Sequence, residues 1–502
     1  MKKLSVLFVL ILNVLLLSAQ QPSFRFAVIS DTHISSENKQ NSDDLNSVIA
    51  DINAQQGIAF VLVTGDITDK GDLKSLTEAK KMLSKLNAPF YVVAGNRDTK
   101  NTDDFGINFK RVFGDNKFRH SLNGFFFLGL SSGQYQNAQE GHFSAQDIEW
   151  LKRTLKNIGK RRPVFFVTHH PLKTGDVDNW FEVTDILRQH NTQAAISGHY
   201  HKNLVLNYDG IAGILNTTTL RNEENSAHYN IYEMADSLYV YDKKIGEAAE
   251  KWFALAVEQK FHPNTDSKNF PRPNFDVNRE YKNVKEVWLK RLPTNTYANP
   301  IVHNGLMYFG SETGEFYCFD IKNGKQKWTF RAMDKIVGSA VAVDDKLIFG
   351  STDRNVYCLD ANTGKLIWKY LYKYAIFTDM CIYEDVVLLF TIDDVTELKI
   401  SDGTINPVIV IEHTKGSGEY YNYTENHKDF VDKHNLGKGE LFYDESFFIF
   451  LSENGVISFI DENENILAKR KIGNTSFNRP VKVGERDYVF TTTSGYVGRI
   501  IF

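Results

Sequence analysis

A repeat of 40 residues in the second half of the chain is the feature that most constrains the fold. Residues 306–330 (LMYFGSETGEFYCFDIKNGKQKWTF) align without a gap with residues 346–370 (KLIFGSTDRNVYCLDANTGKLIWKY). Each copy carries three short apolar segments separated by turn residues, a pattern typical of one blade of a β-propeller. The shared positions are Gly310 and Gly350, Cys318 and Cys358, Asp320 and Asp360, Gly324 and Gly364, and Trp328 and Trp368.

Weaker copies of the repeat follow at 386–405, 447–472 and 487–502, and the last copy stops before its Trp-bearing strand. A spare strand of that type, KEVWLKRL at 285–292, precedes the first full copy. We therefore predict an all-β propeller of about five blades over residues 285–502, in which 285–292 complete the final blade and close the ring. The insertion at 413–438 is expected to form a long loop.

The first half of the chain follows a different pattern, in which short apolar runs alternate with segments of helical periodicity. Apolar residues recur at helical spacing in 45–52 and 148–158, and Ser144 is suited to be an N-cap. Strands that alternate with helices predict an α/β layered domain, here residues 22–243. The expected buried strands are 24–30, 60–65, 90–95, 125–130, 164–168 and 194–197.

Residues 244–284 are predicted to connect the two domains. The segment EAAEKWFALAVEQ (247–259) has the composition of a helix, and the residues after it are polar and rich in proline. We expect a linker that contains one helix.

The first nineteen residues have the three parts of a secretory signal peptide: a positive start, an apolar run and small residues that end at Ala19. The alternative is an uncleaved anchor, although the run is short for a span of about 20 residues. We expect a mature protein without a transmembrane span, in the periplasm or secreted. The three cysteines cannot form a complete disulfide framework and are expected to be small buried residues in strands.

Composition narrows the class of function. The 502 residues are 42% hydrophobic and 24% charged, as in globular proteins, and the length suggests two or three domains. The net charge of −4 argues against a large nucleic-acid-binding surface, which normally needs a basic excess.

Five of the predicted strands of the first domain are each followed by side chains of the types that bind metal ions. The carboxyl ends of strands in open α/β sheets are where sites assemble, so these side chains are expected to converge. Carboxylates, an amide and imidazoles together suit Zn, Mn or Fe, and two ions about 3.5–4 Å apart that share one carboxylate would use the whole set. The residues are Asp31, His33, Asp66, Asn96, His169, His170, His199 and His201.

The order of these motifs, DxH, GD, GN, H and GHxH, resembles that of the calcineurin-like metallophosphoesterases over about residues 22–240. The resemblance implies an α/β four-layer sandwich, with two sheets between helices, and phosphoester hydrolysis by a water that two metal ions activate. By position, it implies that Asp31, His33 and His201 hold one metal ion. It implies in the same way that Asn96, His169 and His199 hold the other, that Asp66 bridges them, and that His170 lies beside the ligands.

The stretch GNRD (95–98) departs from the family pattern, which usually has His after the Asn. An imidazole with a pKa near ~6.5 can donate a proton at neutral pH, whereas a guanidinium with a pKa above ~12 cannot. Arg97 can still bind a phosphate oxygen. We expect Asp66, Asn96, Arg97 and Asp98 to act in catalysis, and substrates with good leaving groups to be preferred.

The repeats in residues 285–502 resemble the quinoprotein-like (PQQ-type) propeller repeats. We expect a scaffold, or a ring that binds a protein or glycan partner, without a bound cofactor. Two alternatives stay open: a partner-binding protein with a vestigial metal domain, and a quinone-dependent oxidoreductase. For the leading interpretation, an exported phosphoesterase that acts on a small phosphoester, the sequence leaves open a monoester, diester, cyclic nucleotide or pyrophosphate substrate.

Overall fold

The computed structural model describes residues 23–99, 106–133, 141–221, 226–257, 272–390, 395–405, 436, 438–444 and 447–502. The chain divides into two compact units. The first contains two six-stranded sheets, and the second contains the sheets that follow residue 285 together with residues 141–153 and 173–182. The signal peptide predicted at 1–19 and most of the insertion at 413–438 lie outside the described residues.

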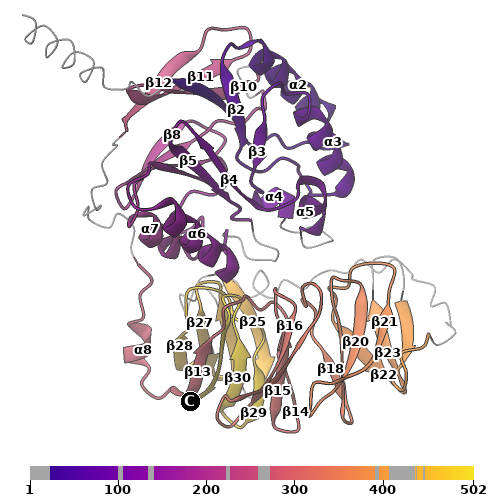
Figure 1. The fold of residues 1–502 in the computed structure, drawn as a ribbon. Helices are drawn as coiled ribbons and strands as arrows, with labels where there is room; N and C mark the ends of the chain where they lie inside the picture. Colours follow the sequence, from indigo (N-terminus) through magenta and orange to yellow (C-terminus); the bar gives the residue numbers. More distant parts are fainter. Residues whose placement is uncertain are drawn as a thin grey trace, which may run out of the picture. The chain divides into compact units, whose positions relative to one another are not determined.

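The first sheet of the N-terminal half has three parallel strands at one side and three antiparallel strands at the other. Helices α2 (Lys39–Ala54) and α3 (Leu73–Leu83) cover one of its faces (Figure 1). Leu45 and Val48 of α2 are fully buried there, as their helical spacing predicts. The strand order is β12 (Glu250–Ala256), β11 (Ser237–Lys244), β10 (His228–Met234), β1 (Phe24–Ile29), β2 (Ile58–Val63) and β3 (Phe90–Val92).

The second sheet packs face to face with the first through a core rich in aromatic rings. Phe26 and Phe60 of the first sheet stack at 4.8 Å, and Phe127 of the second meets Phe26 edge-on at 5.3 Å. Helices α6 (Ala145–Ile158) and α7 (Trp180–Leu187) follow strands β5 and β6 in the chain, so strands and helices alternate here as the sequence predicts. The strand order is β4 (Lys117–Leu122), β5 (Phe125–Leu130), β6 (Val164–Val167), β7 (Thr192–Ser197), β9 (Ile211–Leu215) and β8 (Leu204–Tyr208).

Two local predictions have opposite outcomes. Ser144 caps α6 as expected, because its hydroxyl accepts a hydrogen bond from the backbone N–H of Asp147 at 3.1 Å and donates one to the Asp147 carboxylate at 2.9 Å.

The prediction of a helix at 247–259 is wrong, because residues 250–256 form strand β12, which pairs with the edge of β11. Trp252 and Phe253 favour a strand, and they pack against the core between the sheets. The connector still holds one short helix, α8 (Val277–Glu280).

The propeller has five antiparallel sheets among the described residues, four with four strands and one with three (Figure 1). The two best copies of the repeat have strand bounds 40 residues apart, as predicted. The sheets are β14 (Ile301–His303), β15 (Leu306–Gly310), β16 (Glu315–Asp320) and β17 (Gln326–Arg331); β18 (Val341–Val343), β19 (Lys346–Gly350), β20 (Asn355–Asp360) and β21 (Leu366–Leu371); β22 (Met380–Tyr383), β23 (Val386–Phe390) and β24 (Val395–Lys399); β25 (Gly439–Asp444), β26 (Phe447–Ser452), β27 (Val456–Ile460) and β28 (Ile466–Lys471); and β13 (Lys285–Arg291), β31 (Tyr496–Ile501), β30 (Asp487–Thr491) and β29 (Val481–Gly484).

Ring closure occurs as the sequence predicts. Strand β13, which precedes all the other propeller strands in the chain, pairs antiparallel with β31, the last strand. The final blade is therefore built from both ends of the propeller sequence, and β31 has a partner strand on each side.

A tryptophan joins each of three blades to the next. Trp288 donates its indole N–H to the carbonyl of Ile321 at 2.9 Å, and Trp328 and Trp368 bond the next blades in the same way. Each ring also packs against a glycine of the next blade that has a positive φ, as Trp328 does against Gly364. The shared Trp and Gly positions of the repeat are thus the contact between blades.

The cysteines only partly follow the prediction. Cys318 and Cys358 are buried free thiols in strands β16 and β20, whereas Cys381 in β22 is exposed, so for Cys381 the predicted burial is wrong. Alternate strand residues face opposite sides of a sheet, which lets Met380 be buried while its neighbour is not.

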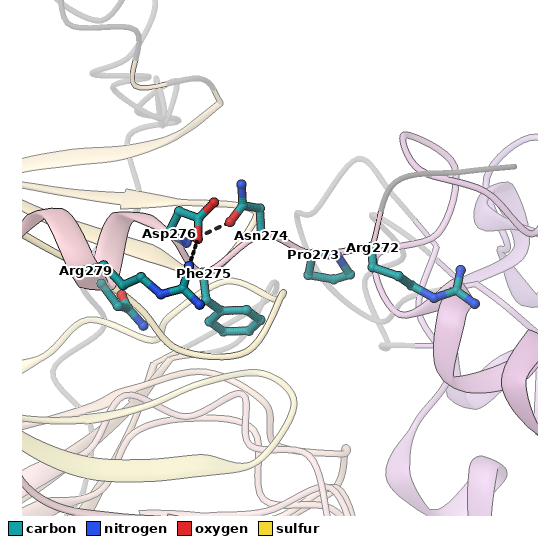
Figure 2. Close-up of a pocket in the computed structure, with 7 residues that line it drawn as sticks. Arg272, Pro273, Asn274, Phe275, Asp276 and Arg279 are labelled. Carbon is teal, nitrogen blue, oxygen red and sulfur yellow. Dashed lines mark hydrogen bonds and ion pairs between the residues drawn. The ribbon is translucent and has the colours of Figure 1, made fainter. Parts of the chain in front are cut away.

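The connector borders a pocket of about 730 Å³, lined by seven residues between Arg272 and Arg279 (Figure 2). Asp276 accepts a hydrogen bond from Arg279 at 2.7 Å, and its own N–H donates to the side chain of Asn274 at 2.7 Å. All of the lining comes from this one short stretch of chain. None of the described helices combines the length and apolar composition needed to cross a bilayer.

We expect Gly364→Ala to destabilise the propeller. A Cβ at this position would lie 2.5 Å from the Trp328 ring, and φ is +69°. Gly305→Ala is the matched control, because its φ is +74° but nothing lies within 4 Å. Urea denaturation should show Gly364→Ala to be less stable than Gly305→Ala by about 1–3 kcal/mol, the usual cost of overpacking. Equal losses would mean that the Trp contact contributes nothing.

Candidate metal centre

The structure brings together all seven residues that the sequence predicts as candidate metal ligands. Each lies just beyond the carboxyl end of a strand, three strands from the first sheet and two from the second. The positions are Asp31 and His33 after β1, Asp66 after β2, Asn96 after β3, His169 after β6, and His199 and His201 after β7.

Most of these positions have an unusual backbone conformation. Five of the seven residues have a positive φ, between 44° and 73°. This left-handed region costs a residue other than glycine about 1–3 kcal/mol, and such residues gather at functional sites. The five are Asp31, His33, Asp66, His199 and His201.

Backbone hydrogen bonds between neighbouring loops hold this conformation. The N–H groups of Asp31 and His33 donate to the carbonyls of Gly65 and Asp66, both at 3.0 Å. The loop after β3 approaches equally closely, because a Cβ on Gly95 would overlap the carboxylate of Asp66. Glycine is therefore required at position 95 for the two loops to meet.

Asp31, His33 and His201 form the first cluster. The Nε2 atoms of His33 and His201 face each other at 3.1 Å, and His201 Nε2 lies 3.3 Å from Asp31 Oδ1. Oδ1 is buried and accepts no hydrogen bond, whereas Oδ2 accepts one from the hydroxyl of Ser30 at 2.5 Å and one from the N–H of His199 at 3.1 Å. An unsatisfied buried oxygen thus points at two imidazole nitrogens.

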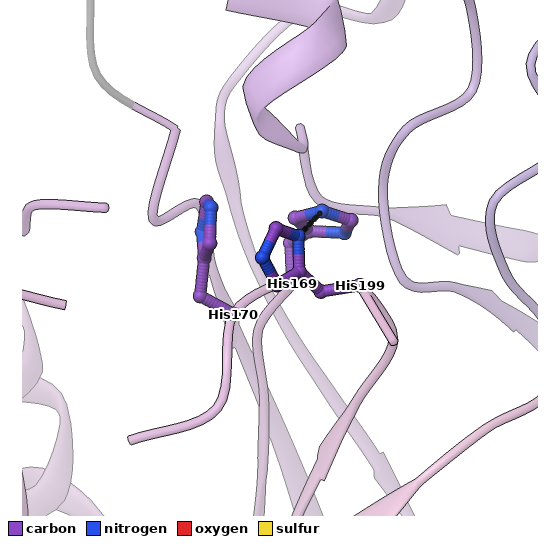
Figure 3. Close-up of side chains that lie close together, drawn as sticks. All are labelled: His169, His170 and His199. Carbon is purple, nitrogen blue, oxygen red and sulfur yellow. Dashed lines mark hydrogen bonds between the residues drawn. The ribbon is translucent and has the colours of Figure 1, made fainter. Parts of the chain in front are cut away.

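The second cluster surrounds His169, which is fully buried. Its Nε2 lies 3.2 Å from both Asn96 Oδ1 and His199 Nδ1, and 3.4 Å from Asp66 Oδ2. Figure 3 shows the rings of His169 and His199 turned toward each other. One oxygen or nitrogen each of Asp31, Asp66 and His169 also falls within 4.8 Å of the others, so Asp66 lies between the two clusters.

These residues fit a pair of transition-metal ions. Metal bonds to His and Asp are about 2.0–2.2 Å long, which places neighbouring ligand atoms of one ion roughly 3.0–3.5 Å apart. The separations of 3.1–3.4 Å fall in this range. Nitrogen and oxygen donors together suit Zn, Mn or Fe.

Two histidines are oriented through their second ring nitrogen. His33 Nδ1 donates to the carboxylate of Asp69 at 2.8 Å, and His169 Nδ1 donates to the carbonyl of Thr64 at 2.9 Å. A proton at Nδ1 leaves the lone pair on Nε2, which is the atom that faces the cluster. Asp69 was not predicted from the sequence, where its position three residues after Asp66 in GDITD was the available signal.

Asp66 and His169 also determine each other's charge. Burial opposes ionisation of Asp66, but the nearby His169, helped by hydrogen bonds, lowers the pKa of Asp66 to about 2. Burial likewise opposes protonation of His169, and the Asp66 carboxylate outweighs it and raises the pKa of His169 to about 9. The carboxylates therefore stabilise a positive charge beside Asp66. When no cation is bound, a proton on His169 supplies this charge.

Arg97 and Asp98 differ in their exposure to solvent and in their hydrogen bonds. Arg97 is exposed, and its backbone N–H donates to Asp66 Oδ1 at 2.7 Å. Asp98 is fully buried and accepts hydrogen bonds from the N–H groups of Gly95, Ile67 and Thr68. Burial, and then the charge of Asp66, raise the pKa of Asp98 to about 7. These hydrogen bonds join the loop that follows β2 to the loop that follows β3.

Two further residues near the ligands have partners of their own. His170 is 1% exposed, and its Nδ1 lies 2.8 Å from the hydroxyl of Ser132. Its ring packs 4.5 Å from that of His199, beside the second cluster (Figure 3). Arg221 donates from Nε to the carboxylate of the buried Asp44 at 2.6 Å.

Comparison with known proteins supports the family resemblance of the first domain. Residues 24–203 match the model of the calcineurin-like phosphoesterase family. Over these residues the N-terminal domain is similar to the calcineurin-like phosphoesterases. The match confirms the predicted class of enzyme, a phosphoric ester hydrolase.

Relatives of the phosphoesterase domain include two probable phosphodiesterases. A probable glycerophosphodiester phosphodiesterase from Arcobacter nitrofigilis is 28% identical over 199 residues, which cover 35% of this chain and 70% of that protein. A probable cyclic nucleotide phosphodiesterase from Coxiella burnetii is 26% identical over 196 residues, or 37% of this chain and 78% of the relative.

The propeller matches a different family model. Residues 279–370 and 331–406 match the repeat described as outer membrane protein assembly factor BamB, which confirms the PQQ-like resemblance. The structure of BamB from Moraxella catarrhalis aligns with 55% of this chain and 82% of its own, at 13% identity and a TM-score of 0.21. The propeller is identified by its five antiparallel sheets and by the pairing of β13 with β31.

We expect Asp69→Ala to weaken metal binding at the His33 cluster. Without the Asp69 carboxylate the His33 ring loses its orientation, and the loss of such a partner typically lowers metal affinity 10–100-fold. Isothermal titration calorimetry with Mn²⁺ or Zn²⁺ should show one weakened site and one unchanged site.

Glu37→Ala is the matched control, because Glu37 is exposed and pairs with Lys70 rather than with a ligand. If Asp69→Ala binds metal as tightly as Glu37→Ala at both sites, Asp69 does not orient His33.

Proposed function

We propose that this chain is an exported phosphoesterase that uses two metal ions to hydrolyse a small phosphomonoester or phosphodiester. The convergence of seven donor residues at separations of 3.1–3.4 Å supports the proposal most strongly. In this proposal Asp31, His33 and His201 hold one ion of Mn, Fe or Zn. The other is held by Asn96, His169 and His199, and Asp66 bridges the two.

The residues of the chain would have separate roles in phosphoester hydrolysis. Bound metal ions supply the Lewis acidity that activates water and neutralises phosphoryl charge. Asp69 and Thr64 keep the imidazoles of His33 and His169 in the orientation that binds a cation. Arg97, exposed beside Asp66, binds a phosphoryl oxygen and holds the phosphate in place.

Arg97 also bears on the choice of substrate. A guanidinium does not release a proton at neutral pH, so it does not assist departure of a basic alkoxide. His170 is almost fully buried against Ser132 and is not exposed to a leaving group. We therefore propose that substrates with good leaving groups, such as aryl esters or phosphoanhydrides, react fastest.

Arg97→His should raise kcat/KM for alkyl phosphoesters by about tenfold or more, because an imidazole at this position can protonate the leaving group. Aryl phosphoesters should gain little. Arg97→Ala serves as the control, since it removes the guanidinium without adding a proton donor. If Arg97→His and Arg97→Ala have the same ratio of alkyl to aryl rates, proton donation at position 97 does not limit the reaction.

Asp66→Asn tests the proposed function itself. The amide keeps the shape of the side chain but removes the charge that both ions would share, so metal content and hydrolysis should fall together. Plasma mass spectrometry and the hydrolysis of bis(p-nitrophenyl) phosphate and p-nitrophenyl phosphate measure the two effects.

The same Asp-to-Asn change at Asp72 is the control for this experiment. Asp72 caps α3 by accepting a hydrogen bond from the N–H of Ser75 at 2.9 Å, and asparagine caps helices equally well. Asp72→Asn should keep full metal content and activity. Unimpaired hydrolysis by Asp66→Asn would overturn the proposal.

Export and the role of the propeller are further parts of the proposal. The positive start, apolar run and small residues of 1–19 support cleavage near Ala19, which N-terminal sequencing of the mature protein would test. For the propeller we propose a scaffold, or a surface that binds a protein or glycan partner. The family it matches is named for an outer membrane assembly factor, which is consistent with a periplasmic or secreted location.

A further inference from the structure

A second buried pair of histidine and carboxylate lies in the first unit, apart from the seven ligands. His228 begins β10 and Asp242 lies on the adjacent strand β11, with His228 Nδ1 3.4 Å from Asp242 Oδ1. The side chains are only 11% and 22% exposed. None of the metal-type clusters within the described residues includes either one.

Four polar atoms around this pair make no hydrogen bond: both ring nitrogens of His228, Asp242 Oδ1 and Asn230 Oδ1. A buried polar atom without a partner costs about 1–3 kcal/mol. Asn230 follows His228 by two residues on β10 and is the cross-strand partner of Asp242, so all three side chains lie on one face of the sheet. Several unsatisfied atoms on one face indicate a missing partner common to them.

The distance within the pair distinguishes it from an ordinary hydrogen bond. His33–Asp69 and His142–Asp178 are hydrogen-bonded, at 2.8 Å each. The pairs among the candidate ligands, His201–Asp31 and His169–Asp66, are longer, at 3.3 and 3.4 Å. His228 and Asp242, at 3.4 Å, belong to the second kind.

We propose that His228, Asp242 and Asn230 bind a third divalent transition-metal ion. One nitrogen and two oxygens form a donor set suited to Zn or Mn, and three protein ligands leave positions for water. The amide nitrogen of Asn230 donates to the side chains of Asn203 and Asn216, at 2.7 and 2.8 Å, which fixes the amide and assigns Oδ1 to the ion.

The third ion would have a structural role. It cross-links β10 to β11, and β10 pairs with β1, the strand that leads into Asp31 and His33. Loss of the ion should therefore lower the thermal stability of the first unit while phosphoester hydrolysis persists. The partly exposed Asp242 provides access from solvent.

Metal stoichiometry of the full chain tests this proposal. After loading with Zn²⁺ or Mn²⁺ and gel filtration, wild type should carry three ions per chain, and His228→Ala and Asp242→Ala two each. Lys244→Ala is the matched control, because Lys244 is the cross-strand partner of His228 and offers no ligand to a cation. It should retain all three ions.

Crystals of the wild-type protein loaded with Zn²⁺ provide a measurement that does not depend on folding of the variants. An anomalous peak between His228 Nδ1 and Asp242 Oδ1 is expected. A water at that position, or the same metal content in wild type and His228→Ala, would overturn the third site. If the dinuclear centre bound no metal, the metal content of wild type would still exceed that of His228→Ala. The proposed function and the third site can therefore be disproved independently of each other.

Discussion

The close contact between the loops that follow β1, β2 and β3 is the constraint on which the candidate metal centre depends. The N–H groups of Asp31, His33 and Ile34 bond to successive carbonyls of residues 65–67, at 2.8–3.0 Å. Asp98, buried below, accepts hydrogen bonds from Gly95 and from the loop after β2. These bonds hold the ligand residues in left-handed backbone conformations that they would otherwise avoid, and so fix the directions of their side chains.

The energetic logic of the site follows from that constraint. Strain in the backbone, facing imidazoles and a buried unsatisfied oxygen of Asp31 are all unfavourable in isolation. The two packed cores of the first domain, one under the helices and one between the sheets, supply the stability that sustains them. The propeller follows a simpler rule, in which a Trp of one blade packs on a Gly of the next and the first strand closes the last blade.

The sequence predicted the parts of the structure that depend on periodicity and on strand ends. The 40-residue repeat located the blades, and residues 285–292 joined the final blade as expected. The seven candidate ligands could be grouped because each follows a buried strand, and their side chains lie together in the structure. By contrast, 247–259 looked helical, and only the free edge of β11 makes it a strand. A local pattern does not contain that information.

The sequence also did not distinguish residues that touch the site from those that support it. Asp98 was expected to act in catalysis, whereas its burial and hydrogen bonds suggest a role in positioning. Asp69 was overlooked because a carboxylate in a loop is usually solvated, and only the 2.8 Å contact with His33 shows its place. Both cases depend on distances between residues about 30 positions or more apart.

The most direct measurement for the central claim is a crystal structure of the protein loaded with Mn²⁺. Two anomalous peaks about 3.5–4 Å apart are expected, with the Asp66 carboxylate bound to both ions. A single peak, or an Asp66 carboxylate bound to neither ion, would contradict the claim.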